Sequence, residues 1–194
     1  MKKILAGAIW PRVRSKDVLL AFLFTGATAA AARTSFHLPF TPVPVTLQTL
    51  SAILAGLTLG SRLGALSQLQ YLALGLAGAP IFANPPYGGP AAFLSPSFGY
   101  IPGFAAGAFL AGWSWERVGR KSFAGAALAA ALGAAAIYAA GVPWLAGYLI
   151  VTTGQTASEC AVQSWLTGAA PFIGADALKV VVAAAIASKG RLKG

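Results

Sequence analysis

The sequence predicts an all-α integral membrane protein, built as a bundle of six transmembrane helices with both termini in the cytoplasm. Two observations on composition support this prediction: 57% of the 194 residues are hydrophobic, and only 9% are charged. Soluble domains are typically about 45–50% apolar and about 25% charged. The third observation is that long uncharged stretches alternate with short clusters of Lys and Arg. This composition argues against a disordered chain, a disulfide-rich secreted domain or an ordinary soluble enzyme.

The uncharged stretches define the expected helices. A helix needs about 20 mostly apolar residues to cross roughly 30 Å of hydrocarbon. The uncharged stretch 63–115 is too long for one span, and its proline- and glycine-rich part at 79–90 divides it in two, because these residues end helices. We therefore expect a single domain, residues 1–194, with helices near 17–34, 46–60, 63–79, 97–115, 121–140 and 171–188.

Three long connections are expected on the outer side, at residues 35–45, 80–96 and 141–170. The last is too long for a turn, and its apolar middle, residues 145–153, is expected to lie at the membrane interface or to re-enter the membrane. Long outer connections and short inner ones indicate a site near the outer face.

The distribution of basic residues predicts the orientation. Short loops that carry Lys and Arg stay on the cytoplasmic side of the membrane. With six spans, both termini and the even connections share a side, and that side holds 12 of the 14 Lys and Arg residues: Lys2, Lys3, Arg12, Arg14, Lys16, Arg62, Arg117, Arg120, Lys121, Lys189, Arg191 and Lys193. Both termini are therefore expected in the cytoplasm, with the protein in the plasma membrane. The rule accounts for the net charge of +10, so a nucleic-acid partner is not needed. The basic residues beside the first helix are expected to contact anionic membrane lipid.

No set of catalytic residues is recognisable. The phosphate-binding pattern G-x-x-x-x-G-K-S/T is absent. One histidine, His37, and one cysteine, Cys160, cannot build a zinc or iron–sulfur site. We therefore expect no enzyme activity, no metal and no cofactor.

Asp176 and Lys179 are the strongest candidates for a binding site. Both lie in or at the start of the last apolar helix, and a spacing of three residues places them on one helix face. Ionisable residues within a membrane are costly and usually functional. An acceptor and a cation about one turn apart suit a small ligand with N–H donors at one end and a carboxylate at the other. The alternative is that the two charges only neutralise each other and so let the helix insert.

Other outer segments complete the expected pocket. The proline-stiffened segment 38–48 ends with Thr46 and Gln48, and Asn84 lies in the second outer connection. Phe40, Tyr87 and Tyr100 are candidates for apolar walls, or alternatively for an aromatic belt at the membrane surface.

Small residues lie on one face of the first helix, at Ala21, Thr25 and Ala29. Such faces let helices approach closely. We therefore expect this face to dock another membrane protein.

Three ordered segments of the sequence resemble the BioY family, the biotin-specific S components of energy-coupling-factor (ECF) vitamin transporters. They are residues 39–50 (PFTPVPVTLQTL), residues 64–69 (GALSQL) leading to 75–83 (GLAGAPIFA), and residues 171–176 (PFIGAD) with Lys179. The sequence departs from the family at 95–100 (SPSFGY), where Gly-Pro-Thr usually precedes a Gly-Tyr pair. Ser in place of Thr keeps the hydroxyl group.

The resemblance implies a six-helix fold and biotin capture from outside. It implies that Asp176 and Asn84 bind the ureido ring and that Lys179 binds the carboxylate end. It also implies a membrane-embedded T component and a pair of ATPases as partners, with docking through small residues on the first helix. Two alternatives stay open: an S component for another vitamin, or a membrane scaffold that transports nothing.

Overall fold

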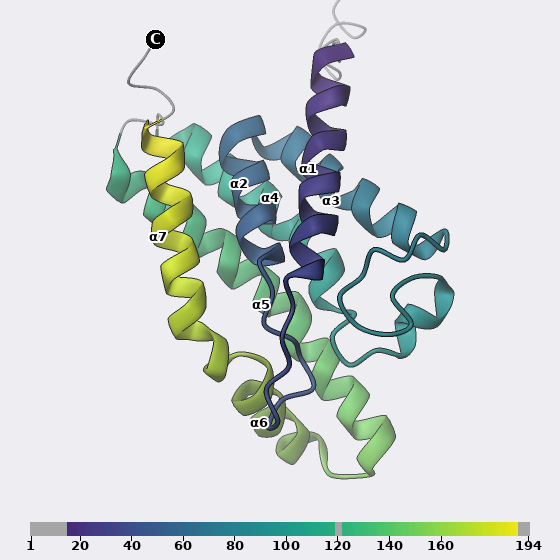
Figure 1. Ribbon diagram of the computed structural model, residues 1–194. Helices are drawn as coiled ribbons and strands as arrows, with labels where there is room; N and C mark the ends of the chain where they lie inside the picture. The colour runs from purple at the N-terminus through teal and green to yellow at the C-terminus, as the bar shows by residue number, and fades with distance from the viewer. Residues whose placement is uncertain (1–14, 119–121, 190–194) are drawn as a thin grey trace, which may run out of the picture.

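The computed structural model describes residues 15–118 and 122–189, and within these ranges the fold is all-helical (Figure 1). The α-helices are α1 (Ser15–Arg33), α2 (Gln48–Leu59), α3 (Ser61–Leu76), α4 (Tyr100–Arg117), α5 (Phe123–Thr153), α6 (Ala157–Gly168) and α7 (Ile173–Lys189). Two short 3-10 helices, η1 (Pro90–Leu94) and η2 (Ala170–Phe172), lie in the connections. Eight of the basic residues used for the orientation lie outside the described residues: Lys2, Lys3, Arg12, Arg14, Arg120, Lys121, Arg191 and Lys193.

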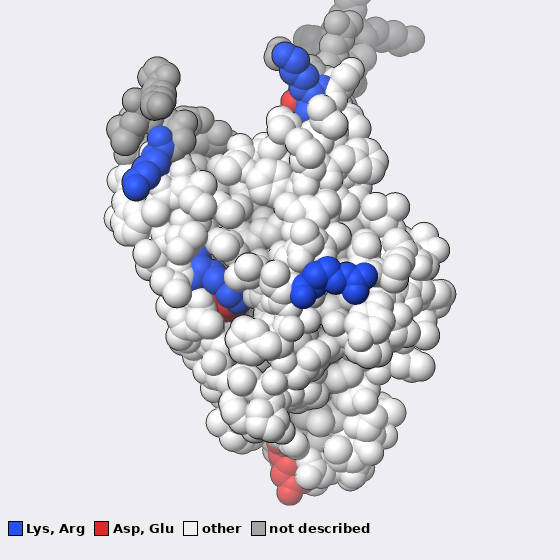
Figure 2. Space-filling model, in the orientation of Figure 1, with Lys and Arg blue, Asp and Glu red and all other residues white. Residues whose placement is uncertain are grey.

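Within the described residues, three helical stretches are long and apolar enough to cross a membrane: α1, α5, and the succession of α6, η2 and α7. Helix α2 is apolar but shorter. Charged side chains are scarce over the face shown in Figure 2, where they lie at its two ends and in two groups near its middle. The structure therefore agrees with a helical membrane protein.

The centre of the bundle is formed by α2, α4 and α5. Helix α1 packs against α2 and α3 on one side, and α7 packs against α2 and α5 on the other. The start of α1 and the end of α7 lie at the same end of the bundle (Figure 1). Helix α6 lies at the opposite end, together with the loop of residues 34–47 that joins α1 to α2.

Glycine residues bring α2, α3 and α4 into backbone contact. A Cβ atom on Gly56 would overlap the carbonyl oxygen of Ala108 in α4, and one on Gly64 would lie 2.7 Å from the Cα of Gly56. Gly56 and Gly64, together with Gly60, form a row of glycines spaced four residues apart in the sequence. They act in packing within this chain, as such faces do in membrane bundles.

The structure corrects the prediction for the second half of the chain. The helix expected at 121–140 continues to Thr153, so the apolar stretch 145–153 is its last part and not a re-entrant connection. Pro143 lies inside this helix. Its missing N–H costs one hydrogen bond, a loss that membrane helices tolerate where neighbouring helices pack around them. The predicted helix therefore ended 13 residues too early.

The rest of the expected 141–170 connection contains α6. Gly154 ends α5 in the left-handed conformation, with φ of 68°. Thr156 and Glu159 then form a reciprocal capping box, in which the Glu159 carboxylate accepts from the Thr156 amide at 3.0 Å. This T-x-x-E pattern is a helix-start signal that was present in the sequence.

Candidate ligand-binding cavity

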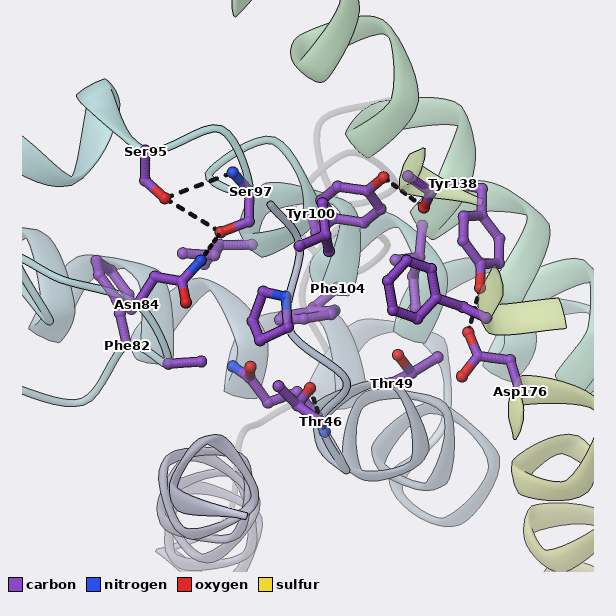
Figure 3. A pocket seen from close by; sticks show the side chains of 18 of the residues that line it. Thr46, Thr49, Phe82, Asn84, Ser95, Ser97, Tyr100, Phe104, Tyr138 and Asp176 are labelled. Atoms are coloured by element: carbon purple, nitrogen blue, oxygen red, sulfur yellow. Dashed lines mark hydrogen bonds between the residues drawn. The ribbon is translucent and has the colours of Figure 1, made fainter. Parts of the chain in front are cut away.

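A cavity lies among α2, α4, α5 and α7 and is covered by two loops, residues 34–47 and residues 77–99. The space between atoms here is about 690 Å³, counting the part that opens to solvent. All five residues expected to bind ligand line this one cavity: Gln48, Asn84, Tyr100, Asp176 and Lys179. Figure 3 shows Asp176 on one side of the cavity and Asn84 on the opposite side.

One end of the cavity holds a buried ion pair. The Lys179 ammonium lies 2.6 Å from Oδ1 of Asp176, and the two side chains are 11% and 9% exposed. The hydroxyl of Tyr138 on α5 donates to Oδ2 of Asp176 at 2.5 Å (Figure 3). Both oxygens of the carboxylate therefore have a donor, and the ammonium keeps two further N–H groups.

This contact bears on the expected division of roles between Asp176 and Lys179. Because Nζ and Oδ1 touch, the two charged groups lie together at one end of the cavity. Tyr138 was not predicted, because it lies in an alanine-rich helix, 38 residues before Asp176 in the sequence. The signal available was a tyrosine hydroxyl within an apolar stretch.

The opposite end of the cavity is polar but uncharged. The Asn84 amide nitrogen donates to the Ser97 hydroxyl at 2.9 Å, and the hydroxyls of Ser97 and Ser95 lie 3.1 Å apart (Figure 3). Trp144 on α5 donates its indole N–H to the Ser95 carbonyl at 3.1 Å and so fixes this segment to the bundle. Ser97 lies in residues 95–100, where the sequence departs from the family pattern, and its hydroxyl group makes hydrogen bonds here.

Hydrogen bonds from the side walls hold the surrounding segments together. Tyr100 donates its hydroxyl to the Gly168 carbonyl at 2.7 Å, so its ring, rather than its hydroxyl group, forms the cavity wall. Thr41 in the 34–47 loop donates to the Thr167 carbonyl at 2.6 Å. Gln48 donates to the Tyr71 hydroxyl at 2.7 Å.

The middle of the cavity is apolar, with walls that include Val43, Phe82, Phe104, Ile137 and Phe172. Phe40 and Tyr87, which were candidates for these walls, are exposed and do not line it. Among the residues described, no three His, Cys, Asp or Glu side chains could hold a metal ion together. The arrangement suits an elongated organic ligand with a polar group at each end.

The predicted docking face on α1 is wrong for two of its three residues. Ala21 and Thr25 are buried, and the Thr25 hydroxyl lies 2.8 Å from the Ser67 carbonyl of α3. Ala29 is half-buried against the core. The small face of α1 thus lets it approach α3 within this chain, and its outward face carries large residues such as Leu19 and Phe22.

Comparison with known proteins now gives the family. The model of the BioY family matches residues 2–193. The chain belongs to the BioY family. A relative named probable biotin transporter BioY, from Pyrococcus horikoshii, is 36% identical over 177 residues, which are 91% of this chain and 97% of the relative. The biotin transporter BioY of Thermotoga maritima is 34% identical over 172 residues, 89% of this chain and 94% of the relative.

The fold of this BioY-family chain also matches a solved structure. That crystal structure is described as the S-component for biotin from an ECF-type ABC transporter. The TM-score is 0.77 at 23% identity, with 96% of each chain covered. The likeness shows that the two proteins share a fold.

Proposed function

We propose that this protein is the substrate-binding membrane component of a biotin uptake system and binds biotin in the cavity described above. The observation that carries the proposal is the meeting of Asp176, Lys179 and Asn84 at one cavity whose middle is apolar. Biotin has a ureido ring at one end, an apolar ring and chain in the middle, and a carboxylate at the other end. The relatives named as biotin transporters support the same ligand.

We assign the ureido ring to the ion-pair end. A ureido group presents a carbonyl flanked by N–H groups, and these complement an ammonium beside a carboxylate. A ligand carboxylate in the same place would lie close to Asp176, and like charges at short range in a site of low polarity repel each other strongly. The carboxylate then lies at the end formed by Asn84, Ser95 and Ser97, whose amide and hydroxyl groups donate hydrogen bonds.

The chain is not an enzyme in this proposal, and energy for uptake comes from partners. S components of ECF transporters work with a membrane-embedded T component and a pair of ATPases, and the solved structure with the same fold is an S-component of this type. We propose the same partners here. We also propose six membrane spans in the plasma membrane, with α6 on the outer side and both termini in the cytoplasm.

The function is tested by thermal melting of the purified protein with a panel of vitamins. A ligand at 100 times its dissociation constant adds about 2.7 kcal/mol to the stability of the folded state. We expect biotin to raise the melting temperature and the other vitamins to leave it unchanged. A shift with a different vitamin would identify an S component for that vitamin, and no shift with any would support a scaffold.

The orientation is tested by cysteine labelling in a Cys160→Ala background. Cys160 itself is fully buried and is a poor target. We expect Gln155→Cys, exposed between α5 and α6, to react with a membrane-impermeant maleimide on intact cells. The control Lys189→Cys, exposed at the end of α7, should react only after the membrane is permeabilised. Labelling of Lys189→Cys on intact cells would show the inverted orientation.

A further inference from the structure

The two loops that cover the cavity are joined by a side-chain hydrogen bond outside its lining. Nε2 of His37, in the 34–47 loop, lies 2.7 Å from Oδ1 of Asn84, in the 77–99 loop. An amide oxygen only accepts hydrogen bonds, so Nε2 carries the hydrogen in this contact. His37 is exposed and does not line the cavity, whereas Asn84 and Ser97 do.

This bond favours one of the two ways in which the Asn84 amide can face. The amide makes its second contact through Nδ2, which donates to the Ser97 hydroxyl at 2.9 Å (Figure 3). A hydroxyl group both donates and accepts, so Ser97 would tolerate either orientation of the amide. An imidazole with a hydrogen on Nε2, which is the imidazolium ion or the Nε2–H tautomer, tolerates only the orientation with the amide oxygen toward the ring, whereas the Nδ1–H tautomer would accept from a turned amide. The amide nitrogen is thereby kept on the Ser97 side, with one N–H beyond the one that Ser97 uses.

We infer that His37 is a positioning residue that determines ligand specificity by holding the Asn84 amide in its donating orientation. This end of the cavity then offers N–H and O–H donors, which favour a ligand acceptor such as a carboxylate. If the amide turned over, its oxygen would face the ligand and repel a carboxylate. The inference rests on the proposed function, which places the biotin carboxylate at this end.

The test compares the binding of biotin and biotin methyl ester to His37→Leu and His37→Gln. A neutral hydrogen bond contributes a factor of about 2- to 12-fold. We expect His37→Leu to weaken biotin binding by about this factor and the binding of the ester by less, so that the preference for the acid falls. His37→Gln should restore only part of the preference, because its amide can donate to Oδ1 of Asn84 but can also accept from a turned Asn84 amide. The control Phe40→Leu, an exposed change in the same loop, should alter neither ligand.

A double-mutant cycle with Asn84→Ala shows whether His37 acts through Asn84. We expect His37→Leu to have no further effect on biotin binding once Asn84 is alanine, because His37 then has no amide to hold. The effects of the two changes are therefore not additive. An equal effect of His37→Leu in both backgrounds would overturn the inference. A second result would also overturn the inference: Asn84→Ala loses biotin binding, but His37→Leu keeps both its biotin affinity and its preference for the acid. That result would leave the proposed function intact.

Unchanged biotin binding in Asn84→Ala has a different meaning, because it would remove Asn84 from the biotin site and overturn both this inference and the placement of the carboxylate on Asn84, while biotin binding itself would stand. Melting of each variant without ligand measures its folding. If His37→Leu fails to fold, the cycle is made with His37→Phe, which keeps a ring of similar size but has no donor.

Discussion

Lys179→Ala is expected to weaken the binding of biotin and of biotin methyl ester by the same factor, about 10- to 150-fold. This is the range expected when a charged hydrogen-bonding partner is removed from a buried site, roughly 1.5–3 kcal/mol. Both ligands keep the ureido ring, so both lose the same contact. Asp176→Asn should behave in the same way. Titration calorimetry of each ligand with each variant measures the two factors.

The competing assignment gives a different pattern. If Lys179 binds the biotin carboxylate, as the family resemblance implied, Lys179→Ala abolishes the preference for the acid over the ester. A pair that only assists helix insertion gives a third pattern. Each single change then leaves a buried charge without its partner, a loss of about 3–5 kcal/mol in folding, while the double variant Asp176→Ala with Lys179→Ala regains both folding and biotin binding. Biotin binding in that double variant would remove both residues from the site.

Gly56→Ala is expected to destabilise the bundle by about 3 kcal/mol or more, the upper range for adding atoms to a packed core. The added methyl group would overlap the Ala108 carbonyl, and a backbone atom cannot move aside as a side chain can. Helices α2 and α4 would have to separate, and they carry Gln48 and Tyr100 of the cavity. We therefore expect a large fall in the melting temperature and weaker biotin binding.

The matched control is Gly147→Ala on α5. A Cβ atom at Gly147 would meet no atom within 4 Å, so this change should leave the melting temperature nearly unchanged. Equal melting of the two variants would mean that α2 and α4 are not in backbone contact, contrary to the packing described here.

The sequence was sufficient for the helical membrane class and for five of the residues that line the cavity. Asp176 and Lys179 were identifiable because charge in an apolar helix is rare, and Asn84 because the resemblance placed it. The length of α5 was not predictable from local signals, because a proline such as Pro143 can lie either beyond the end of a helix or inside a membrane helix. In the structure, α5 packs against α4, α6 and α7.

The docking face on α1 was misassigned for a related reason. Small residues at a spacing of four show that a helix packs closely against something, but they do not show whether the partner is the same chain. The contact of Thr25 with the Ser67 carbonyl depends on the position of α3, which the sequence of α1 alone does not contain. The contacts of Tyr138 and His37 likewise join segments far apart in the chain.

The unequal lengths of α3 and α5 have a consequence for the bilayer in the proposed six-span arrangement. At about 1.5 Å per residue, the 16 residues of α3 span about 24 Å and the 31 residues of α5 about 46 Å, around a hydrocarbon thickness of about 30 Å. Both helices present leucine side chains outward, Leu69 on α3 and Leu128 on α5 among them. In that arrangement, lipid beside α3 would thin, while α5 would tilt or extend into water, each at a cost of a fraction of a kcal/mol per Å. A change in membrane thickness would therefore act on the stability of the protein differently on the α3 side and on the α5 side.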